Sequence, residues 1–286
     1  MAKWNKNEIF KRILIIYLII YSVLLAEFNN PTDCTFSKRS IGDLTQWLSS
    51  SIFPPTVILL LFHYVGCKFI FPVIADKVII ASKYQFNLRE KRIPLVSTHL
   101  FKFCCYLCIG YLGYDALHDM EWLPREFLFG KSGYSGHETM KWLIFERNRF
   151  EHELLPLKVQ RYFEWTAAYH LHSTIWHLKN SRALYNFYEM LLHHFVTLSL
   201  IAFCFLTGHS GIGVLVSILH DLSDIPAYAI KLAVNTSFTV LILTVYALLL
   251  IAWIYYRVIC FAYVLSWLKI DFVSRRRIHG LDFQTL

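Results

Sequence analysis

Long apolar stretches joined by shorter polar connections dominate this chain. A helix needs about 20 mostly apolar residues to cross the hydrocarbon core of a bilayer. The alternation typical of a half-buried strand is absent from these stretches, and open sheet edges are not viable in lipid. The candidate spans are 9–28, 52–75, 98–118, 162–178, 187–207, 210–233 and 238–268. The pattern therefore predicts an all-α membrane protein, a polytopic bundle of about seven transmembrane helices.

Composition and charge agree with this prediction and narrow the set of partners. With 56% hydrophobic and 17% charged residues, the chain is too apolar for an ordinary soluble domain. Its net charge of +8 does not indicate nucleic acid, because the basic residues lie between apolar stretches rather than on one soluble face. By the positive-inside rule, the side of the bilayer that carries these basic residues is cytosolic. These residues are Lys11, Arg12, Lys77, Lys83, Arg89, Lys91, Arg92, Lys179 and Arg182.

Five proton-handling side chains interrupt two consecutive apolar stretches. His193 and His194 are adjacent in the first stretch, and His220, Asp221 and Asp224 occur in the second. An ionised aspartate near the bilayer centre costs about 2.5 to 3.5 kcal/mol on insertion scales. These groups must therefore face protein, a partner or a polar cavity rather than lipid.

Helical geometry predicts which of these groups share a face. At 100° per residue, Glu189 and His193 lie one turn apart, as do His193 and Thr197, so the three form a polar stripe. On the following helix His220 and Asp224 share a face, with Asp221 also one turn from Asp224. A single histidine such as His170, His172 or His177 in a membrane helix is more often a satisfied interhelical hydrogen-bonding residue.

The short connection Gly208–Gly211 predicts that the two helices are antiparallel neighbours. His193 and Asp224 then lie at similar depth, roughly 21 to 23 Å from this turn. The sequence thus predicts one shared polar site in the cytosolic half of the membrane.

Acid–base chemistry suits such a site. A carboxylate that holds one ring nitrogen of a histidine fixes its tautomer and makes it more basic. Acyl transfer to an amine needs a base for the ammonium proton, donors for the oxyanion and an acid for the leaving group. The predicted constellation contains groups for each of these roles.

Metal chemistry is an alternative that the pattern disfavours. His193, His194, His220 and Asp224 could supply zinc or iron ligands, but adjacent histidines point about 100° apart on a helix. A metal-dependent lipid hydroxylase or desaturase would also need several spaced histidine boxes. The isolated CxxC at 105–108 is weak evidence for metal or redox chemistry. We therefore expect no metal and no disulfide framework.

Three motifs in the second half of the chain carry a family resemblance. The run Tyr185–Thr197 contains the histidine pair, Gly211–Val214 follows it, and His220–Asp224 has the form HDxSD with Lys231 shortly after. Together they resemble the signature of ceramide synthases within the TLC-domain membrane proteins. The resemblance covers roughly residues 97–268, and Arg257 falls where the family places a basic residue in a late helix.

This resemblance implies a multi-pass enzyme of the endoplasmic reticulum membrane. Such an enzyme transfers a fatty acyl group from acyl-CoA to the amine of a sphingoid base, giving ceramide or dihydroceramide, with acyl-CoA as co-substrate and no cofactor. The family's paired histidines correspond to His193 and His194, and its acidic pair to Asp221 and Asp224. His220 and Arg257 are supporting candidates.

Roles for these residues follow as hypotheses. His193 is the expected nucleophile or base, oriented by Glu189, and His194 activates the amine or stabilises the oxyanion. The two aspartates hold the imidazoles and stabilise positive charge. Lys179 and Arg182 could attract the phosphates of coenzyme A.

Hydropathy, with the resemblance from residue 97 onward, divides the chain. We expect an N-terminal anchor helix and non-cytosolic loop at 1–50, a further transmembrane helix and basic cytosolic loop at 51–96, the TLC-like catalytic domain at 97–268, and a basic tail at 269–286. The expected partners are the lipid bilayer and the two substrates, and a homodimer or an accessory membrane subunit is compatible with the pattern. A non-catalytic lipid-binding or lipid-handling TLC protein is the alternative, because a fold alone does not imply activity.

Overall fold

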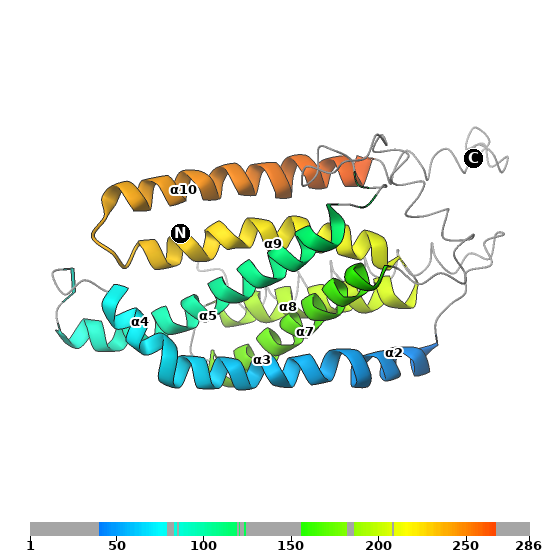
Figure 1. Cartoon of the computed structure of the whole chain (residues 1–286), viewed down its shortest axis with the longest axis horizontal. Coiled ribbons are helices and arrows are strands. Elements are labelled where there is room, and N and C mark those ends of the chain that lie inside the picture. Colours follow the sequence, from blue (N-terminus) through cyan, green and yellow to red (C-terminus); the bar gives the residue numbers. More distant parts are fainter. Residues whose placement is uncertain are drawn as a thin grey trace, which may run out of the picture. The chain divides into compact units, whose positions relative to one another are not determined.

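The computed structural model describes residues 40–78, 83–84, 86–118, 120, 123, 156–181, 186–207 and 209–266. Its regular elements within these ranges are all helical, which confirms the all-α prediction (Figure 1). The candidate span 9–28 and the tail after 266 lie outside the described residues.

The described residues form eleven helical segments. Their bounds are α2 Ile41–Trp47, η1 Leu48–Ile52, α3 Phe53–Val65, η2 Gly66–Ile70, α4 Phe71–Val78, α5 Phe86–Leu117, α7 Leu157–Asn180, α8 Phe187–Leu206, α9 Ser210–Ala233, α10 Thr239–Trp253 and η4 Ile254–Cys260, where η denotes a π-helical segment. The first five are consecutive and form one helix of 38 residues, Ile41–Val78.

Within these ranges, 5 helices are long and apolar enough to cross a membrane: Ile41–Val78, Leu88–Leu117, Phe187–Leu206, Ser210–Ala233 and Thr239–Ser266. Each overlaps a predicted span. The predicted span 162–178 is also helical, as α7, but it is too polar to meet the same criterion. The expected number of about seven spans is therefore roughly supported.

The long first helix has identifiable local determinants. Ser40 caps its N-terminus: the Asp43 backbone N–H donates to Ser40 Oγ over 3.1 Å, and the Ser40 N–H donates to Asp43 Oδ2 over 2.7 Å. This reciprocal pair is a capping box, which satisfies N–H groups that the first turn leaves without intrahelical acceptors. The π-helical segment η1 ends just before Pro54 and Pro55, whose missing N–H groups interrupt the regular ladder.

The chain divides into two compact units. The first comprises Met1–Leu59 and Ala167–Ser210; the second comprises Leu60–Thr166 and Gly211–Leu286. In the first unit α2 packs on α8, where the Trp47 and Phe205 rings stack with centroids 4.2 Å apart. The Thr56 hydroxyl lies 3.3 Å from the carbonyl oxygen of Ala168, which joins the start of α3 to α7.

In the second unit α5 packs closely against α9. A Cβ atom added to Gly113 would lie 2.2 Å from Ile218 Cδ1, and one added to Gly110 would lie 3.0 Å from Ile225 Cδ1. Small residues at this spacing let membrane helices approach closely. The direction is antiparallel, because the later residue of α5 meets the earlier residue of α9.

One end of this unit joins the basic loop to the end of α9. The Lys83 ammonium donates to the carbonyl oxygens of Val234 and Thr236, the latter over 2.7 Å. These carbonyls follow the last turn of α9, where orphan acceptors need partners. The loop carrying Lys83 and the turn after α9 therefore lie at the same end of the unit.

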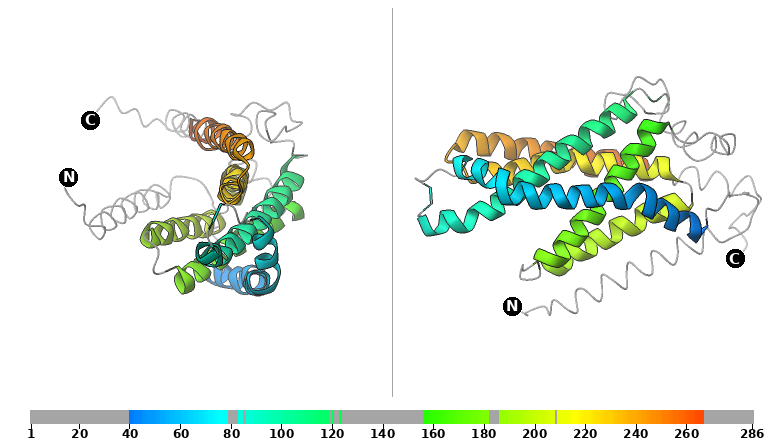
Figure 2. Two further views of the ribbon diagram at one scale, coloured as in Figure 1. Left: turned by 90° about the vertical axis from the view of Figure 1, so that its left-hand side faces the viewer. Right: turned by 60° about the horizontal axis from the view of Figure 1, so that its bottom comes forward.

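The last span lies along α9 with much of its surface exposed. Figure 2 shows α10 and η4 running alongside α9 in the second unit. In the most apolar 18-residue window of Thr239–Ser266 no residue is buried, and Cys260 and Val264 are its buried positions further along. Such an apolar surface is suited to lipid.

Candidate functional site

The histidine pair lies on α8 in the first unit, with the two side chains in different environments. His193 is exposed, whereas His194 is 5% exposed. Their ring centroids are 5.5 Å apart, with planes inclined at 54°. The two imidazoles therefore diverge as the helical geometry predicts, and they can take different roles.

His194 packs against polar residues of α7. Its Nε2 atom lies 3.4 Å from the Ser173 hydroxyl, and its ring centroid is 5.8 Å from that of His177. His177 in turn places Nε2 3.0 Å from the carbonyl oxygen of Phe187, and its ring stacks on the Phe187 ring. Imidazoles thus bridge α7 and α8.

The contact of His177 with Phe187 agrees with the interhelical role expected from the sequence, whereas the sequence analysis assigns no role to Ser173. A usable signal exists in the sequence, because His170, Ser173 and His177 recur at i, i+3 and i+7 and so share one face of α7. This face includes the contacts to His194.

The polar stripe predicted on α8 is present, but Thr197 bonds to the backbone of His193. Glu189 and His193 are both exposed, and the Thr197 hydroxyl donates to the backbone carbonyl of His193 over 2.9 Å rather than serving the imidazole. Such a bond to the carbonyl four residues earlier is a common use of threonine inside helices. The orientation of His193 by Glu189 stays a prediction.

Asp221 is buried on α9 in the second unit, at 2% exposed. The hydroxyl of Tyr162, near the start of α7, donates to Asp221 Oδ2 over 2.6 Å. Tyr162 is itself 1% exposed. A buried carboxylate without such a donor would be costly, because burial removes its water. Tyr162 was not identified as a partner from the sequence, since 59 positions separate it from Asp221.

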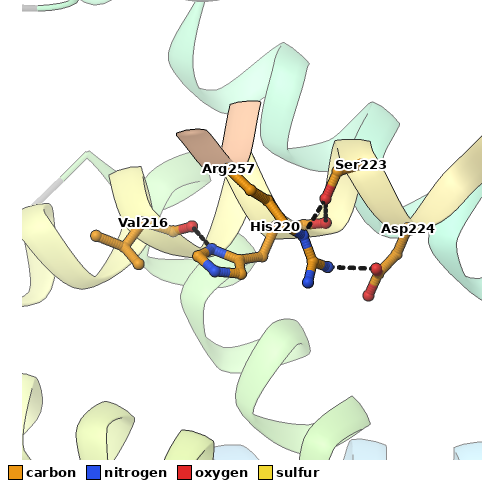
Figure 3. A network of polar contacts seen from close by, with 5 residues as sticks. All are labelled: Val216, His220, Ser223, Asp224 and Arg257. Atoms are coloured by element: carbon orange, nitrogen blue, oxygen red, sulfur yellow. Dashed lines mark hydrogen bonds and ion pairs between the residues drawn. The ribbon is translucent and has the colours of Figure 1, made fainter. Parts of the chain in front are cut away.

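Asp224, one turn later on α9, has a different partner. Figure 3 shows the Arg257 guanidinium of η4 spanning two acceptors: Nη2 pairs with Asp224, and Nε donates to the Ser223 hydroxyl over 2.7 Å. The Ser223 hydroxyl donates in turn to the carbonyl oxygen of His220 over 2.8 Å. Arg257 is thus part of the acidic cluster, and both side chains of the ion pair are partly buried.

His220 completes this network. Its Nδ1 atom lies 2.9 Å from the carbonyl oxygen of Val216, one turn earlier on α9 (Figure 3). If Nδ1 carries the proton for this bond, Nε2 is left as the acceptor nitrogen. The Phe261 ring meets the imidazole edge to face at 5.8 Å.

Within the second unit the two aspartates therefore face different helices. Asp221 meets α7 through Tyr162, and Asp224 meets η4 through Arg257. The histidine pair belongs to the first unit, so the predicted convergence of both pairs on one site stays a prediction, as does the use of the aspartates to hold the imidazoles.

Lys179 and Arg182 are the residues predicted to attract the phosphates of coenzyme A. Lys179 is exposed in the last turn of α7, and Arg182 lies outside the described residues. Among the described residues, no group of three or more His, Cys, Asp and Glu side chains is arranged to hold a metal ion. The expectation of a metal-free site stays a prediction.

Several described helices are long and apolar enough to cross a membrane, and α8 and α9 carry the buried ionisable groups His194 and Asp221, which defines the class of a multi-pass membrane protein. The family model of the TLC domain (TRAM/LAG1/CLN8) matches residues 95–280, and the chain therefore belongs to this family. The match includes the histidine pair, both aspartates and Arg257. No curated protein and no solved structure matches the chain. Family membership links the protein to membrane-lipid functions, of which ceramide synthesis is one.

Proposed function

We propose that this protein is a ceramide synthase-like N-acyltransferase, which moves a fatty acyl group from acyl-CoA to the amine of a sphingoid base. The observation that carries the proposal is the adjacent pair His193–His194 on an apolar helix of a TLC domain, where only His194 is buried. A passive lipid binder has no need for two imidazoles and two carboxylates inside apolar helices, because each costs free energy there.

The environments of the two histidines support a division of roles. His193 is exposed, so a substrate can reach its imidazole, which acts as base or nucleophile. His194 is held by packing against Ser173 and His177, and it stabilises the oxyanion or activates the amine. A fixed donor does this better than a mobile one, because it needs no reorganisation during the reaction.

The reaction balances without a further reactant. The base removes a proton from the ammonium group, and the amine nitrogen then attacks the thioester carbonyl carbon. The new C–N bond gives a tetrahedral oxyanion, which collapses as the C–S bond breaks. The nitrogen passes its second proton to the thiolate of the leaving coenzyme A, and the base releases the first proton to water.

Substrates and setting belong to the same proposal. The enzyme acts in the endoplasmic reticulum membrane as a multi-pass protein, takes acyl-CoA from the cytosol, and needs neither metal nor cofactor. Lys179 and Arg182 contribute to attracting the coenzyme A phosphates. A homodimer or an accessory membrane subunit would complete the assembly.

The decisive experiment measures N-acylation in purified membranes. Labelled sphinganine is supplied with acyl-CoAs of different chain lengths, for the wild type and for the His193→Ala, His194→Ala double variant. Labelled dihydroceramide from the wild type alone supports both reaction and site. No product from a wild type that is shown to be folded and inserted would contradict the proposal and favour the lipid-handling role.

A further inference from the structure

A group of basic side chains lies between α5 and α9 in the second unit. Its residues are not those of the Arg257–Asp224 ion pair. The Lys102 ammonium lies 5.6 Å from the centroid of the Tyr228 ring, and the Lys231 ammonium lies 4.0 Å from it. The two ammonium groups, from different helices, therefore approach one aromatic ring. We call Lys102, Lys231, Tyr228 and the neighbouring His99 the basic cluster.

The residues that α5 contributes to the cluster and its surroundings share one face of the helix. His99, Lys102 and Tyr106 recur at i, i+3 and i+7, which places them on one side of the helix. The Tyr106 ring stacks on Tyr228 with centroids 5.2 Å apart, and the His99 ring meets Tyr228 at 6.3 Å. The two buried tyrosines thus stack on each other beside the ammonium groups.

Positive charge in the cluster exceeds the negative charge near it. The charges of Arg92, Lys102 and Lys231 all act on the His99 imidazole. Asp224 is close enough to act on Lys102, but it already forms an ion pair with Arg257. Like charges gathered in an apolar span repel one another, and an anionic ligand would remove that repulsion.

Ordinary structural roles explain only part of the cluster. Lys231 lies in the last turn of α9, where a cation complements the helix dipole. Lys102 lies in the interior of the apolar span Leu88–Leu117, so the dipole gives no reason for its charge. In addition, the buried Nδ1 atom of His99 has no hydrogen-bond partner among the described residues.

We infer that the basic cluster binds a phosphate group, with Lys102, Lys231 and His99 as its donors. A phosphate ester offers several acceptor oxygens and up to two negative charges, which suits donors that converge from two helices. The cluster lies toward the end of the unit where Lys83 meets the turn after α9, the end that the basic loop makes cytosolic. The phosphate belongs either to coenzyme A or to an anionic phospholipid, and in the coenzyme A case the inference rests on the proposed function.

The test measures phosphate binding rather than acyl transfer, so that the two proposals can fail separately. The full chain is placed in nanodiscs of phosphatidylcholine, and binding of free coenzyme A, which carries no acyl group, is measured by calorimetry. A second arm measures enrichment of phosphatidylserine around the protein in mixed nanodiscs. The variants are Lys102→Gln and Lys231→Gln, with Lys102→Arg and Lys231→Arg as charge-retaining versions.

Lys68→Gln is the matched control. Lys68 also lies over aromatic rings in the same unit, 5.4 Å from the Tyr64 centroid and 5.3 Å from the Phe69 centroid, but outside the basic cluster. Each glutamine substitution in the cluster should weaken binding about tenfold or more, because it removes a charged hydrogen bond. The arginine variants and Lys68→Gln should bind as the wild type does.

The two arms separate the possible sources of the phosphate. A loss confined to coenzyme A assigns the cluster to the soluble substrate, and a loss confined to phosphatidylserine assigns it to a lipid headgroup. Unchanged binding of both probes in folded glutamine variants would overturn the inference, even if N-acylation is observed. The inference would also be wrong if Lys68→Gln weakens binding as much as the cluster variants do.

Discussion

Arg257 and Asp224 form an ion pair that joins η4 to α9 across 33 positions of the chain. The same guanidinium holds the Ser223 hydroxyl, so one arginine orders two consecutive residues of the HDxSD motif. The ion pair therefore holds the Asp224 side chain on the face of α9 that contacts η4. It also gives the last span a polar attachment to α9.

Replacing Arg257 by Gln should lower the free energy of unfolding by about 1.5 to 3 kcal/mol, the usual contribution of a hydrogen bond to a charged group. Arg257→Lys keeps the charge but not the fork that serves both acceptors, so it should have an intermediate effect. Thermal unfolding in detergent measures both. Equal stability of the Gln variant and the wild type would show that the pair contributes nothing.

Tyr162→Phe should destabilise the protein by about 1 to 3 kcal/mol, because it leaves the buried Asp221 carboxylate without that donor. Tyr111→Phe is the matched control, since Tyr111 lies on α5 in the same unit and is 68% exposed. Chemical denaturation of both variants gives the comparison. A change as small as that of the control would mean that the hydroxyl is not needed by Asp221.

Gly113→Ala tests the close approach of α5 to α9. Its Cβ would lie 2.2 Å from Ile218 Cδ1 and 2.8 Å from the Tyr162 ring, so we expect a loss of about 1 to 3 kcal/mol from overpacking. Adding Ile218→Val removes that Cδ1 atom and should restore part of the stability. Gly42→Ala, whose Cβ would meet the Ser40 hydroxyl at 3.3 Å, should be mild.

A double-mutant comparison of melting temperatures decides this prediction. The tight crossing is contradicted if Gly113→Ala lowers the melting temperature no more than Gly42→Ala does. It is also contradicted if the effects of Gly113→Ala and Ile218→Val on the melting temperature simply add in the double variant.

The two histidines should respond differently to replacement by alanine. His193→Ala should reduce N-acylation by about 100-fold or more, the usual contribution of a general base, with little change in melting temperature because the side chain is exposed. His194→Ala should reduce both activity and stability, because it removes a buried ring from contact with His177.

Initial rates and melting temperatures of the same preparations distinguish the effect of each histidine on activity from its effect on stability. Intact acyl transfer by His193→Ala together with complete loss in His194→Ala would reverse the assigned roles. A melting temperature of His194→Ala equal to that of the wild type would show that its packing does not stabilise the protein.

Hydropathy carried most of the fold prediction, because in lipid every backbone polar group must be satisfied within the spanning segment. Hydropathy predicts the span at 52–75 but not its extension to Ile41, since Ser40 and Asp43 act through capping rather than through apolar character. α7 was predicted as a span, although its polar face makes it less apolar than the others.

The sequence by itself determined which residues are candidates for the chemistry: ionisable groups in apolar helices are costly, so His193, His194, Asp221 and Asp224 are conspicuous without any coordinates. Only the tertiary structure decided their partners. Tyr162 reaches Asp221 and Arg257 reaches Asp224 because helices distant in the chain pack together. Gly113 leaves room for the Tyr162 ring and for Ile218. Periodicity places a residue on a face of its own helix, but the residue opposite it depends on how the helices pack.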